Sequence, residues 1–297
     1  MTGATASGKT DVALDVARTL GCDIISADSR QIYRGMPIGT AAPTPGQLAA
    51  VRHHLVGILD PDQYYSAARF HDDVMELLPR LFSQCPYAVM CGGSMLYVDA
   101  VTDGIDQLPT ITDAVRSRVR ELHAQLGTEG LLAYLENLDP HYAAEVDPAN
   151  VRRIAHAIEI TIQAGRPYSE LRQARRVQRP FDIIKVALDR PRPELFDRIN
   201  RRVDAMMQAG LLDEARRLYP LRHLNSLNTV GYKELFAYMN GQMDLETAVA
   251  RIAKNTRVYA KKQLTWLSRP GIRPTLWLQP EGAAGRILEL VRAQRNV

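Results

Sequence analysis

Hydrophobic positions follow both helical and strand spacing in the first third of the chain. Apolar residues recur three and four apart over 10–20, which predicts a helix that ends at Gly21. The short apolar runs 22–27 and 87–91 are typical of buried strands, and residues 66–82 between them favour a crossover helix. This alternation predicts an α/β fold built on a parallel sheet.

The remaining two thirds of the chain are patterned mostly as helix. Residues 109–180 keep helical spacing, with breaks at 127–130, 139–140 and 147–148 where glycine or Asp-Pro pairs occur. Such a long helical stretch between sheet elements indicates a helical insertion domain.

After the insertion the pattern returns to the core. Residues 181–188 predict a further strand, and long helices are expected over 193–210 and 244–269. The ending 271–279 is patterned as a short strand followed by a tail. We therefore expect three parts: a parallel-sheet core at 1–108, a helical insertion at 109–180, and a return to the core with a helical part and a C-terminal tail at 181–297.

Composition narrows the class of protein. Of the 297 residues, 46% are hydrophobic and 24% charged, which excludes a disordered or collagen-like chain. No apolar run is long enough to cross a membrane, and no signal peptide opens the chain. Three cysteines are too few and too unevenly spaced for a disulfide framework or a zinc site. We expect a cytoplasmic protein with no membrane partner, and take a monomer as the default.

The net charge of +4 is concentrated in two basic segments. Residues 151–180 hold seven arginines against two glutamates, and residues 228–270 hold seven basic residues against three acidic ones. Basic segments on an otherwise acidic chain suggest a polyanionic partner, although solvated helix faces would give the same pattern.

The chain opens on the strongest local motif, a Walker A pattern. Residues 3–10 read Gly-Ala-Thr-Ala-Ser-Gly-Lys-Thr, and the predicted helix follows directly. Glycines let backbone N–H groups surround a diphosphate, the lysine neutralises phosphate oxygens, and the threonine hydroxyl suits Mg²⁺. The candidate diphosphate-binding residues are Gly3, Thr5, Ala6, Ser7, Gly8, Lys9 and Thr10, with Thr10 the candidate metal ligand.

A buried strand normally precedes such a loop, yet only Met1 and Thr2 stand before Gly3. Losing a central parallel strand would leave sheet hydrogen bonds unpaired. We therefore expect that the first strand is missing from this chain and that the native protein begins a few apolar residues upstream.

Asp28 follows the second predicted strand and so falls where parallel sheets place their ligands. It is a candidate Mg²⁺ ligand or substrate-orienting group. The same residue begins Asp-Ser-Arg-Gln, which also resembles turn-capping chemistry.

Seven motifs in order resemble the tRNA dimethylallyltransferase (isopentenyltransferase) family of bacterial type. The first is the opening loop; the others are 28–40 (Asp-Ser-Arg-Gln-Ile-Tyr-Arg-Gly-Met-x-Ile-Gly-Thr), 53–61 (His-His-Leu-Val-Gly-Ile-Leu-Asp-Pro), 150–159 (Asn-Val-Arg-Arg-Ile-Ala-His-Ala-Ile-Glu), 198–206, 229–234 (Thr-Val-Gly-Tyr-Lys-Glu) and 256–266. The resemblance spans nearly the whole chain.

The resemblance implies transfer of the dimethylallyl group from dimethylallyl diphosphate to N6 of the adenosine directly 3′ of a tRNA anticodon, with Mg²⁺ as cofactor. The loop would hold the leaving diphosphate, and the target base would leave the RNA stack. Asp28 matches the family's general base, and Ser94 a threonine near the reaction channel. Here Met95 replaces the family glycine, which changes the channel's shape. Arg202 is the candidate second diphosphate contact, unless it is an exposed helix arginine.

The resemblance also assigns tRNA contacts. Residues 109–180 match the insertion that holds the anticodon stem, and His156 stands where the family usually has arginine. Trp266 could equally belong to the core, and Arg116 is supported only by its charge. The tRNA-contacting candidates are Asp28, Ser29, Arg30, Gln31, Ser94, Arg116, Arg152, Arg153, His156, Thr229, Gly231, Tyr232, Lys233, Lys261, Lys262, Gln263 and Trp266.

Two other functions fit parts of the pattern. A P-loop small-molecule kinase would share the opening, but no arginine-rich phosphate lid follows residue 100. A GTPase-like RNA-binding module would need an Asn-Lys-x-Asp motif, which is absent. The adjacent His53 and His54 point apart on a strand and are interpreted as structural.

Overall fold

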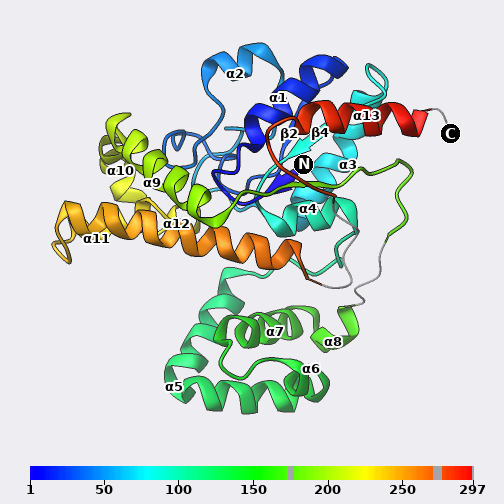
Figure 1. The fold of residues 1–297 in the computed structure, drawn as a ribbon. Coiled ribbons are helices and arrows are strands. Elements are labelled where there is room, and N and C mark those ends of the chain that lie inside the picture. The colour runs from blue at the N-terminus through cyan, green and yellow to red at the C-terminus, as the bar shows by residue number, and fades with distance from the viewer. Residues whose placement is uncertain (173–176, 270–275, 296–297) are drawn as a thin grey trace. The chain divides into compact units, whose positions relative to one another are not determined.

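The computed structural model describes residues 1–172, 177–269 and 276–295 (Figure 1). They form two compact units: the core unit, Met1–Thr102 with Arg179–Val297, and the insertion, Asp103–Gln178. From the hydrophobic pattern of the sequence we had expected the insertion to span residues 109–180. Among the described residues, no helix has the length and apolar character needed to cross a membrane.

The core unit is built on short parallel strands. β2 (Ile24–Ser26) pairs with β3 (His53–His54) and β4 (Val89–Cys91), while β5 (Val186–Leu188) pairs with β1 (Thr2–Gly3) and β6 (Leu276–Leu278). These are two sets of three strands, and every pairing is parallel, as the α/β pattern predicts.

Met1 links the two sets of strands. Its amino group donates to the Met90 carbonyl at 2.6 Å, and the Gly92 N–H donates to the Met1 carbonyl at 3.3 Å. These bonds give the order β3-β2-β4-β1-β5-β6. The sequence had suggested that the first strand is missing; the structure forms it from Thr2 and Gly3, and the expectation of an upstream segment stays a prediction.

Helices cover both faces of the sheet. α1 (Lys9–Leu20) and α13 (Ala283–Arg295) lie side by side on one face (Figure 1), where they enclose Ile24 and Val89 in one apolar cluster. α3 (Ala67–Phe82) packs against α4 (Met95–Thr102) on the other side. α1 ends at Gly21, whose φ of 64° suits glycine, as predicted.

The second helical group of the core unit carries the long helices α9 (Arg192–Gln208) and α12 (Leu245–Leu267), which pack together. Their residues Leu195, Ile199 and Ala260 enclose Ala4 of the opening loop. The group is completed by α10 (Leu211–Leu218), α11 (Tyr232–Met239) and the short turns η1 (Tyr219–Leu221) and η2 (Asn225–Leu227), while α2 (Pro45–Ala50) lies between β2 and β3.

The insertion is a small helical unit with its own core. α5 (Asp113–Leu138) packs along α7 (Val151–Ala164), with α6 (Pro140–Glu145) and α8 (Tyr168–Leu171) beside them. Leu131, Ile154 and Ile158 are fully buried in this core. The predicted break at Gly127 is a kink, with φ at 67°, and Asp139 caps α6.

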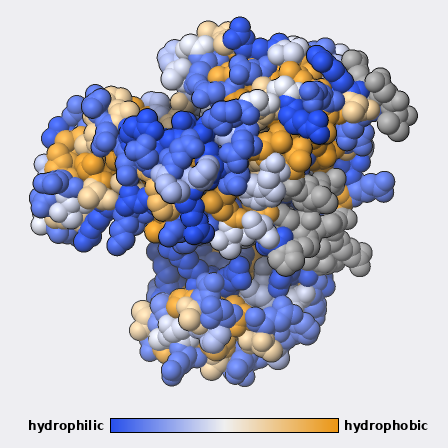
Figure 2. All heavy atoms as spheres, viewed as in Figure 1, coloured by the Kyte–Doolittle hydropathy of each residue, from blue (hydrophilic) through white to orange (hydrophobic). Residues whose placement is uncertain are grey.

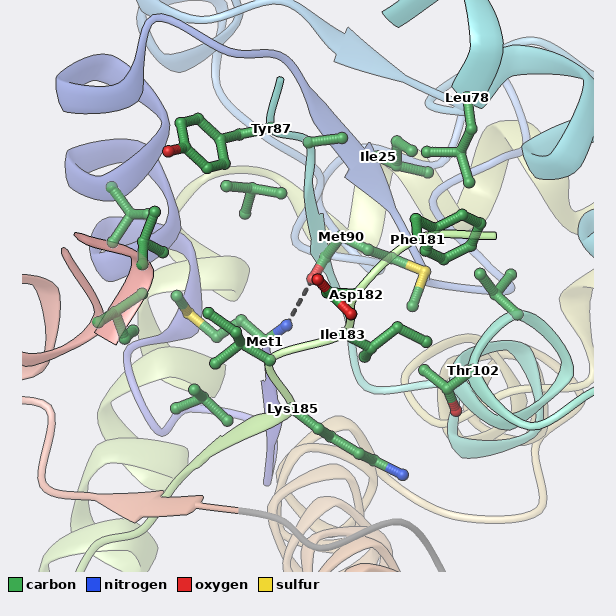
Figure 3. Close-up of a pocket in the computed structure, with 18 of the residues that line it drawn as sticks. Met1, Ile25, Leu78, Tyr87, Met90, Thr102, Phe181, Asp182, Ile183 and Lys185 are labelled. Carbon is green, nitrogen blue, oxygen red and sulfur yellow. Dashed lines mark hydrogen bonds between the residues drawn. The ribbon is translucent and has the colours of Figure 1, made fainter. Parts of the chain in front are cut away.

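Two sequence expectations differ from the structure. The strand predicted over 181–188 is confined to 186–188, and residues 181–184 line a groove instead (Figure 3). The end of the chain is the helix α13 instead of a tail, since Ala283 and Ile287 pack on α1. The start of the predicted strand 271–279 lies outside the described residues, as do Arg175 and Arg176 of the basic segment.

Candidate active site

The opening loop is held in a shape that glycine permits. A Cβ at Gly3 would lie 2.6 Å from the Leu188 carbonyl, so only glycine fits beside β5. Gly8 has φ at 98° and caps α1, and Ala6 also lies in the left-handed region at 63°. A strained non-glycine residue in a loop at a helix N-terminus is typical of a ligand-binding backbone.

Lys9 bends back onto this loop. Its ammonium donates to the Ala4 carbonyl at 2.7 Å. Burial lowers the pKa of Lys9 to about 8, an effect that Arg202 reinforces and Asp28 opposes. An anionic ligand would stabilise the charged form of Lys9 strongly, because its negative charge compensates for the solvation that the ammonium group has lost.

Two arginines of α9 contact the opening loop. Arg198 Nε donates to the Ala6 carbonyl at 2.9 Å, and Arg202 Nη1 contacts Thr5 Oγ1 at 3.4 Å. Together with Lys9, Thr10 and Arg201 they line a pocket of about 380 Å³. Figure 2 shows hydrophilic side chains over the visible face of α9. Arg202 is therefore not the exposed helix arginine of the alternative interpretation.

Arg198 and Arg190 were not assigned from sequence. Arg190 Nε donates to the Ser7 carbonyl at 3.0 Å, so it braces the same loop. The spacing of four between Arg198 and Arg202 places both on one helix face, and this signal could have identified Arg198.

Asp28 caps a turn, which is one of the two roles that the sequence left open; its role toward metal or substrate stays a prediction. Its Oδ1 accepts the N–H groups of Arg30 at 2.9 Å and Gln31 at 3.3 Å, which is turn-capping geometry. In the described part of the chain its Oδ2 has no hydrogen-bond partner. Asp28 also lies close enough to Lys9 and Arg202 to influence both electrostatically. One carboxylate oxygen is thus fixed by backbone while the other can accept a proton.

Ser94 ties the turn at Asp28 to the loop after β4. Its Oγ accepts the Ser29 N–H at 2.8 Å, and its own N–H donates to the Ala27 carbonyl at 3.1 Å. A Cβ at Gly92 would lie 2.1 Å from that carbonyl, so this close approach requires glycine. The hydroxyl of Ser94 is placed beside the candidate base, and Met95 begins α4 next to it.

Gln263 of α12 bridges the two loops of the site. Its Oε1 accepts the Thr5 N–H at 2.8 Å, and its Nε2 donates to the Gly93 carbonyl at 2.8 Å. Tyr259, one turn earlier, also donates to that carbonyl at 3.3 Å. Gln263 is only 2% exposed. The residue expected to touch tRNA is therefore buried and instead connects the phosphate loop to the Ser94 loop.

Two further residues of the Asp28 motif, Arg30 and Gln31, donate hydrogen bonds to backbone carbonyls nearby. Gln31 Nε2 donates to the carbonyls of Thr40 and Ala41, and Arg30 Nη1 donates to those of Asn225 and Ser226. Both side chains shape the site through the backbone that they anchor.

Tyr232 and Trp266 are also held inside the core unit. The Tyr232 hydroxyl donates to Glu214 at 2.6 Å, and Glu214 accepts the N–H groups of Ile38 and Gly39. The Trp266 indole donates to Asp99 at 2.7 Å. Tyr232 is fully buried, which removes it from direct RNA contact, and the core interpretation of Trp266 agrees with its hydrogen bond.

Among the remaining core-unit candidates, the three lysines lie at the surface. Lys261 and Lys262 are exposed on α12, where Lys261 lies over the Phe196 ring, and Lys233 is exposed on α11. Thr229 is half-buried and Gly231, with φ at 101°, caps α11. The exposed lysines suit phosphate contacts.

In the insertion, Arg152 and Arg153 are exposed in the first turn of α7. Exposed cations at a helix N-terminus are only slightly unfavourable, and the contact of these two arginines with RNA stays a prediction. His156 packs edge-on against the Tyr168 ring, and burial together with Arg116 lowers the pKa of His156 below its usual value. Arg116 is half-buried on α5.

The described residues contain no group of three His, Cys, Asp or Glu side chains arranged to hold a metal. His54 instead bonds to Asp23 and His53 to the Val51 carbonyl, which supports their structural interpretation. Mg²⁺ commonly takes few protein ligands and several from phosphate and water. The Thr10 hydroxyl at the pocket fits that pattern.

This chain is similar to known proteins over most of its length. A family model described as IPP transferase matches residues 31–270. A tRNA dimethylallyltransferase of Parabacteroides distasonis is 53% identical, with 94% of this chain and 93% of that protein covered, and one of Porphyromonas gingivalis is 50% identical over 97% and 96%.

Solved structures show the same fold. The tRNA isopentenylpyrophosphate transferase of Bacillus halodurans has a TM-score of 0.71 and 33% identity, covering 98% of this chain and 94% of its own. A eukaryotic dimethylallyltransferase acting on tRNA has a TM-score of 0.77 at 22% identity, covering 94% and 73%. The match of family model, sequence and fold over nearly the whole length shows that the chain belongs to the IPP transferase family.

Proposed function

We propose that this chain transfers the dimethylallyl group from dimethylallyl diphosphate to N6 of the tRNA adenosine immediately 3′ of the anticodon, giving N6-(dimethylallyl)adenosine and diphosphate. The observation that carries the proposal is the convergence of Lys9, Arg202 and Asp28 at the end of the opening loop. A site with fixed cations beside a carboxylate suits a reaction that releases diphosphate and a proton together.

The chemistry divides between the two sides of this site. The N6 nitrogen forms a bond to the first carbon of the dimethylallyl group, and the electrons of the breaking carbon–oxygen bond leave with diphosphate. Lys9, Arg202 and the amides at the start of α1 stabilise the leaving charge. Oδ2 of Asp28 accepts the N6 proton, while Ser94 holds the turn that carries Asp28.

Thr10 is the residue that would hold Mg²⁺, with the diphosphate and water as its other ligands. When bound, the metal would add positive charge to the leaving group. Lys9 and the arginines of α9 supply positive charge at the same pocket from the protein itself.

The tRNA side of the proposal rests on basic residues, most of them exposed. Arg152, Arg153 and His156 of α7 with Arg116 of α5 would contact the anticodon stem, and Lys233, Lys261 and Lys262 would contact phosphates next to the core site. Such contacts would orient the RNA so that a flipped adenosine can reach Asp28. The reaction would take place in the cytoplasm.

Incubation with labelled dimethylallyl diphosphate and unmodified bulk tRNA tests the proposal. We expect label in tRNA only when Mg²⁺ is present, and digestion should release it as N6-(dimethylallyl)adenosine. Label in no nucleoside, from a protein that is folded by circular dichroism, would overturn the proposal. A thermal-shift series separates it from a kinase, because dimethylallyl diphosphate with Mg²⁺ should stabilise the protein more than ATP does.

A further inference from the structure

Glu214 of α10 is a fully buried carboxylate that has no part in the proposed reaction. Its Oε2 accepts the Ile38 N–H at 3.0 Å, and its Oε1 accepts the Gly39 N–H at 2.8 Å and the Tyr232 hydroxyl at 2.6 Å. In the described part of the chain its hydrogen-bond partners are therefore all neutral. An apolar side chain would avoid the cost of burying a charge, so Glu214 is better explained by the arrangement that it fixes than by the stability that it adds.

The two N–H groups belong to a tight turn over residues 36–42. Successive N–H groups can bond to one carboxylate where the chain turns, because in a strand they point to opposite sides. The turn is closed by bonds from the Thr40 N–H to the Met36 carbonyl and from the Ala42 N–H to the Pro37 carbonyl. Glu214 therefore holds this turn by its backbone.

Tyr232 of α11 packs against the same turn. A Cβ at Gly39 would lie 2.5 Å from the Tyr232 ring, so only glycine fits beside the ring at this position. Burial and the neighbouring Glu214 raise the pKa of the Tyr232 hydroxyl, which therefore stays protonated and donates to the carboxylate. Two helices of the second helical group, α10 and α11, thus fix the position of the turn.

The next two residues of the turn are bonded to Gln31 of the Asp28 motif. Gln31 Nε2 donates to the Thr40 carbonyl at 3.2 Å and to the Ala41 carbonyl at 3.0 Å. The Gln31 N–H also donates to Oδ1 of Asp28 at 3.3 Å. A continuous set of bonds therefore runs from Glu214 through the turn and Gln31 to the candidate proton acceptor.

Arg30 connects the same two regions without the turn. Its Nη1 donates to the carbonyls of Asn225 and Ser226 in η2, at 3.0 and 3.2 Å. Its N–H donates to Oδ1 of Asp28 at 2.9 Å. The second helical group therefore anchors both residues whose N–H groups fix Oδ1 of Asp28.

We propose that Glu214 is a positioning residue, which holds Asp28 in its orientation through the turn 36–42 and Gln31. The proposal rests on the proposed transfer reaction, because that reaction needs an oriented proton acceptor. Loss of the bonds to Glu214 should slow the transfer step. It should not weaken binding of dimethylallyl diphosphate, because Lys9 and Arg202 are held by other contacts.

The test measures single-turnover transfer with the protein in excess over tRNA and dimethylallyl diphosphate saturating. An inactive fraction of protein then changes the amplitude and leaves the rate constant unaltered. Glu214→Gln should lower the rate constant about tenfold or more, because its amide NH₂ faces an N–H group that also donates. Gly39→Ala displaces the same turn without removing a polar group and should also slow the reaction. KM for dimethylallyl diphosphate should stay unchanged in both variants.

Asp139 of the insertion offers a matched control. Like Glu214 it is a buried carboxylate with three neutral donors, the Tyr142 N–H and the N–H and hydroxyl of Ser169. Asp139→Asn should lower Tm as Glu214→Gln does, yet keep the wild-type rate constant once the protein saturates the tRNA. An equal loss of rate in Asp139→Asn would overturn the proposal, since any buried carboxylate would then have the same effect.

The double variant Gln31→Leu/Glu214→Gln tests the connection through the turn. It should react about as slowly as the slower single variant, because both substitutions release the same turn. With a wild type that transfers label, a wild-type rate constant in Glu214→Gln or Gly39→Ala, or additive losses in the double variant, would overturn the proposal. If Glu214→Gln does not fold, Gly39→Ala decides alone. A folded wild type without transfer would instead overturn the proposed function, and this proposal with it.

Discussion

Lys9 and Arg202 at the opening loop differ from Arg152 and Arg153 of the insertion in how they are held. The first pair is half-buried and bonded to the loop, Lys9 through the Ala4 carbonyl and Arg202 through Thr5. The second pair is exposed at the start of α7. Fixed, desolvated cations suit a charge that develops at one position, whereas exposed cations suit a polyanion and act in a salt-dependent way.

The largest expected effect on the reaction rate is at Asp28, the proposed proton acceptor near Lys9 and Arg202. Asp28→Asn keeps an oxygen for the turn but cannot accept a proton, so the single-turnover rate should fall by about 10²-fold or more. The affinity for tRNA should stay unchanged. The control is Asp62→Asn at an exposed carboxylate; a normal rate in Asp28→Asn would remove this residue from the chemistry.

Substitution of Gln263 tests whether the opening loop and the Ser94 loop must be held together for activity. Gln263→Leu leaves the Thr5 N–H and the Gly93 carbonyl without their partner, so kcat/KM should fall about tenfold or more. Because both loops shift, the KM for dimethylallyl diphosphate should rise together with the loss in kcat. Thr265→Ala, at an exposed position of the same helix, should change neither, and a Gln263→Leu protein with unaltered kinetics would show that the bridge is dispensable.

The depressed pKa of Lys9 gives the buried cations a pH signature. With a pKa of about 8 in the free protein, Lys9 is charged below pH 8 and loses its charge above it, although an ordinary lysine would stay charged to about pH 10. Binding of dimethylallyl diphosphate should therefore weaken up to about tenfold per pH unit above 8. Lys9→Arg should flatten this profile; an unchanged profile in that variant would assign the titration to another group.

The smallest effect is expected on tRNA affinity at His156, which lies with Arg152 and Arg153 in the insertion. Its pKa lies below the usual value, so it is neutral at pH 7 and becomes charged only as the pH falls below about 6.5. His156→Arg should tighten tRNA binding at pH 7.5 by a few fold and steepen its salt dependence, and the difference from the wild type should shrink as the pH is lowered. Equal affinities of the two proteins at every pH would place His156 outside the RNA contact.

The sequence predicted the parts of the site that depend on local chain geometry. The opening loop, the helix that ends at Gly21 and the position of Asp28 after β2 all follow from neighbouring residues. The arrangement of Gln263 does not, because its partners Thr5 and Gly93 are more than 150 positions away.

Amphipathic spacing also failed to show which face of a helix is buried. Tyr232 has the side chain of an RNA-contacting residue, yet it is fully buried and donates to Glu214 inside the core unit. Which polar group is buried depends on an acceptor from another element, and no local pattern reveals that acceptor.

The measurement that most directly tests the distinction between fixed and exposed cations compares Arg202→Ala with the double variant Arg152→Glu/Arg153→Glu. For each protein, KM for dimethylallyl diphosphate and the salt dependence of tRNA affinity are determined in parallel. We predict that Arg202→Ala raises KM about tenfold or more and leaves the salt slope unchanged. The double variant should lower the salt slope and leave KM for the diphosphate unchanged. If each variant shifted both quantities, the division of labour between the two sets of residues would be contradicted.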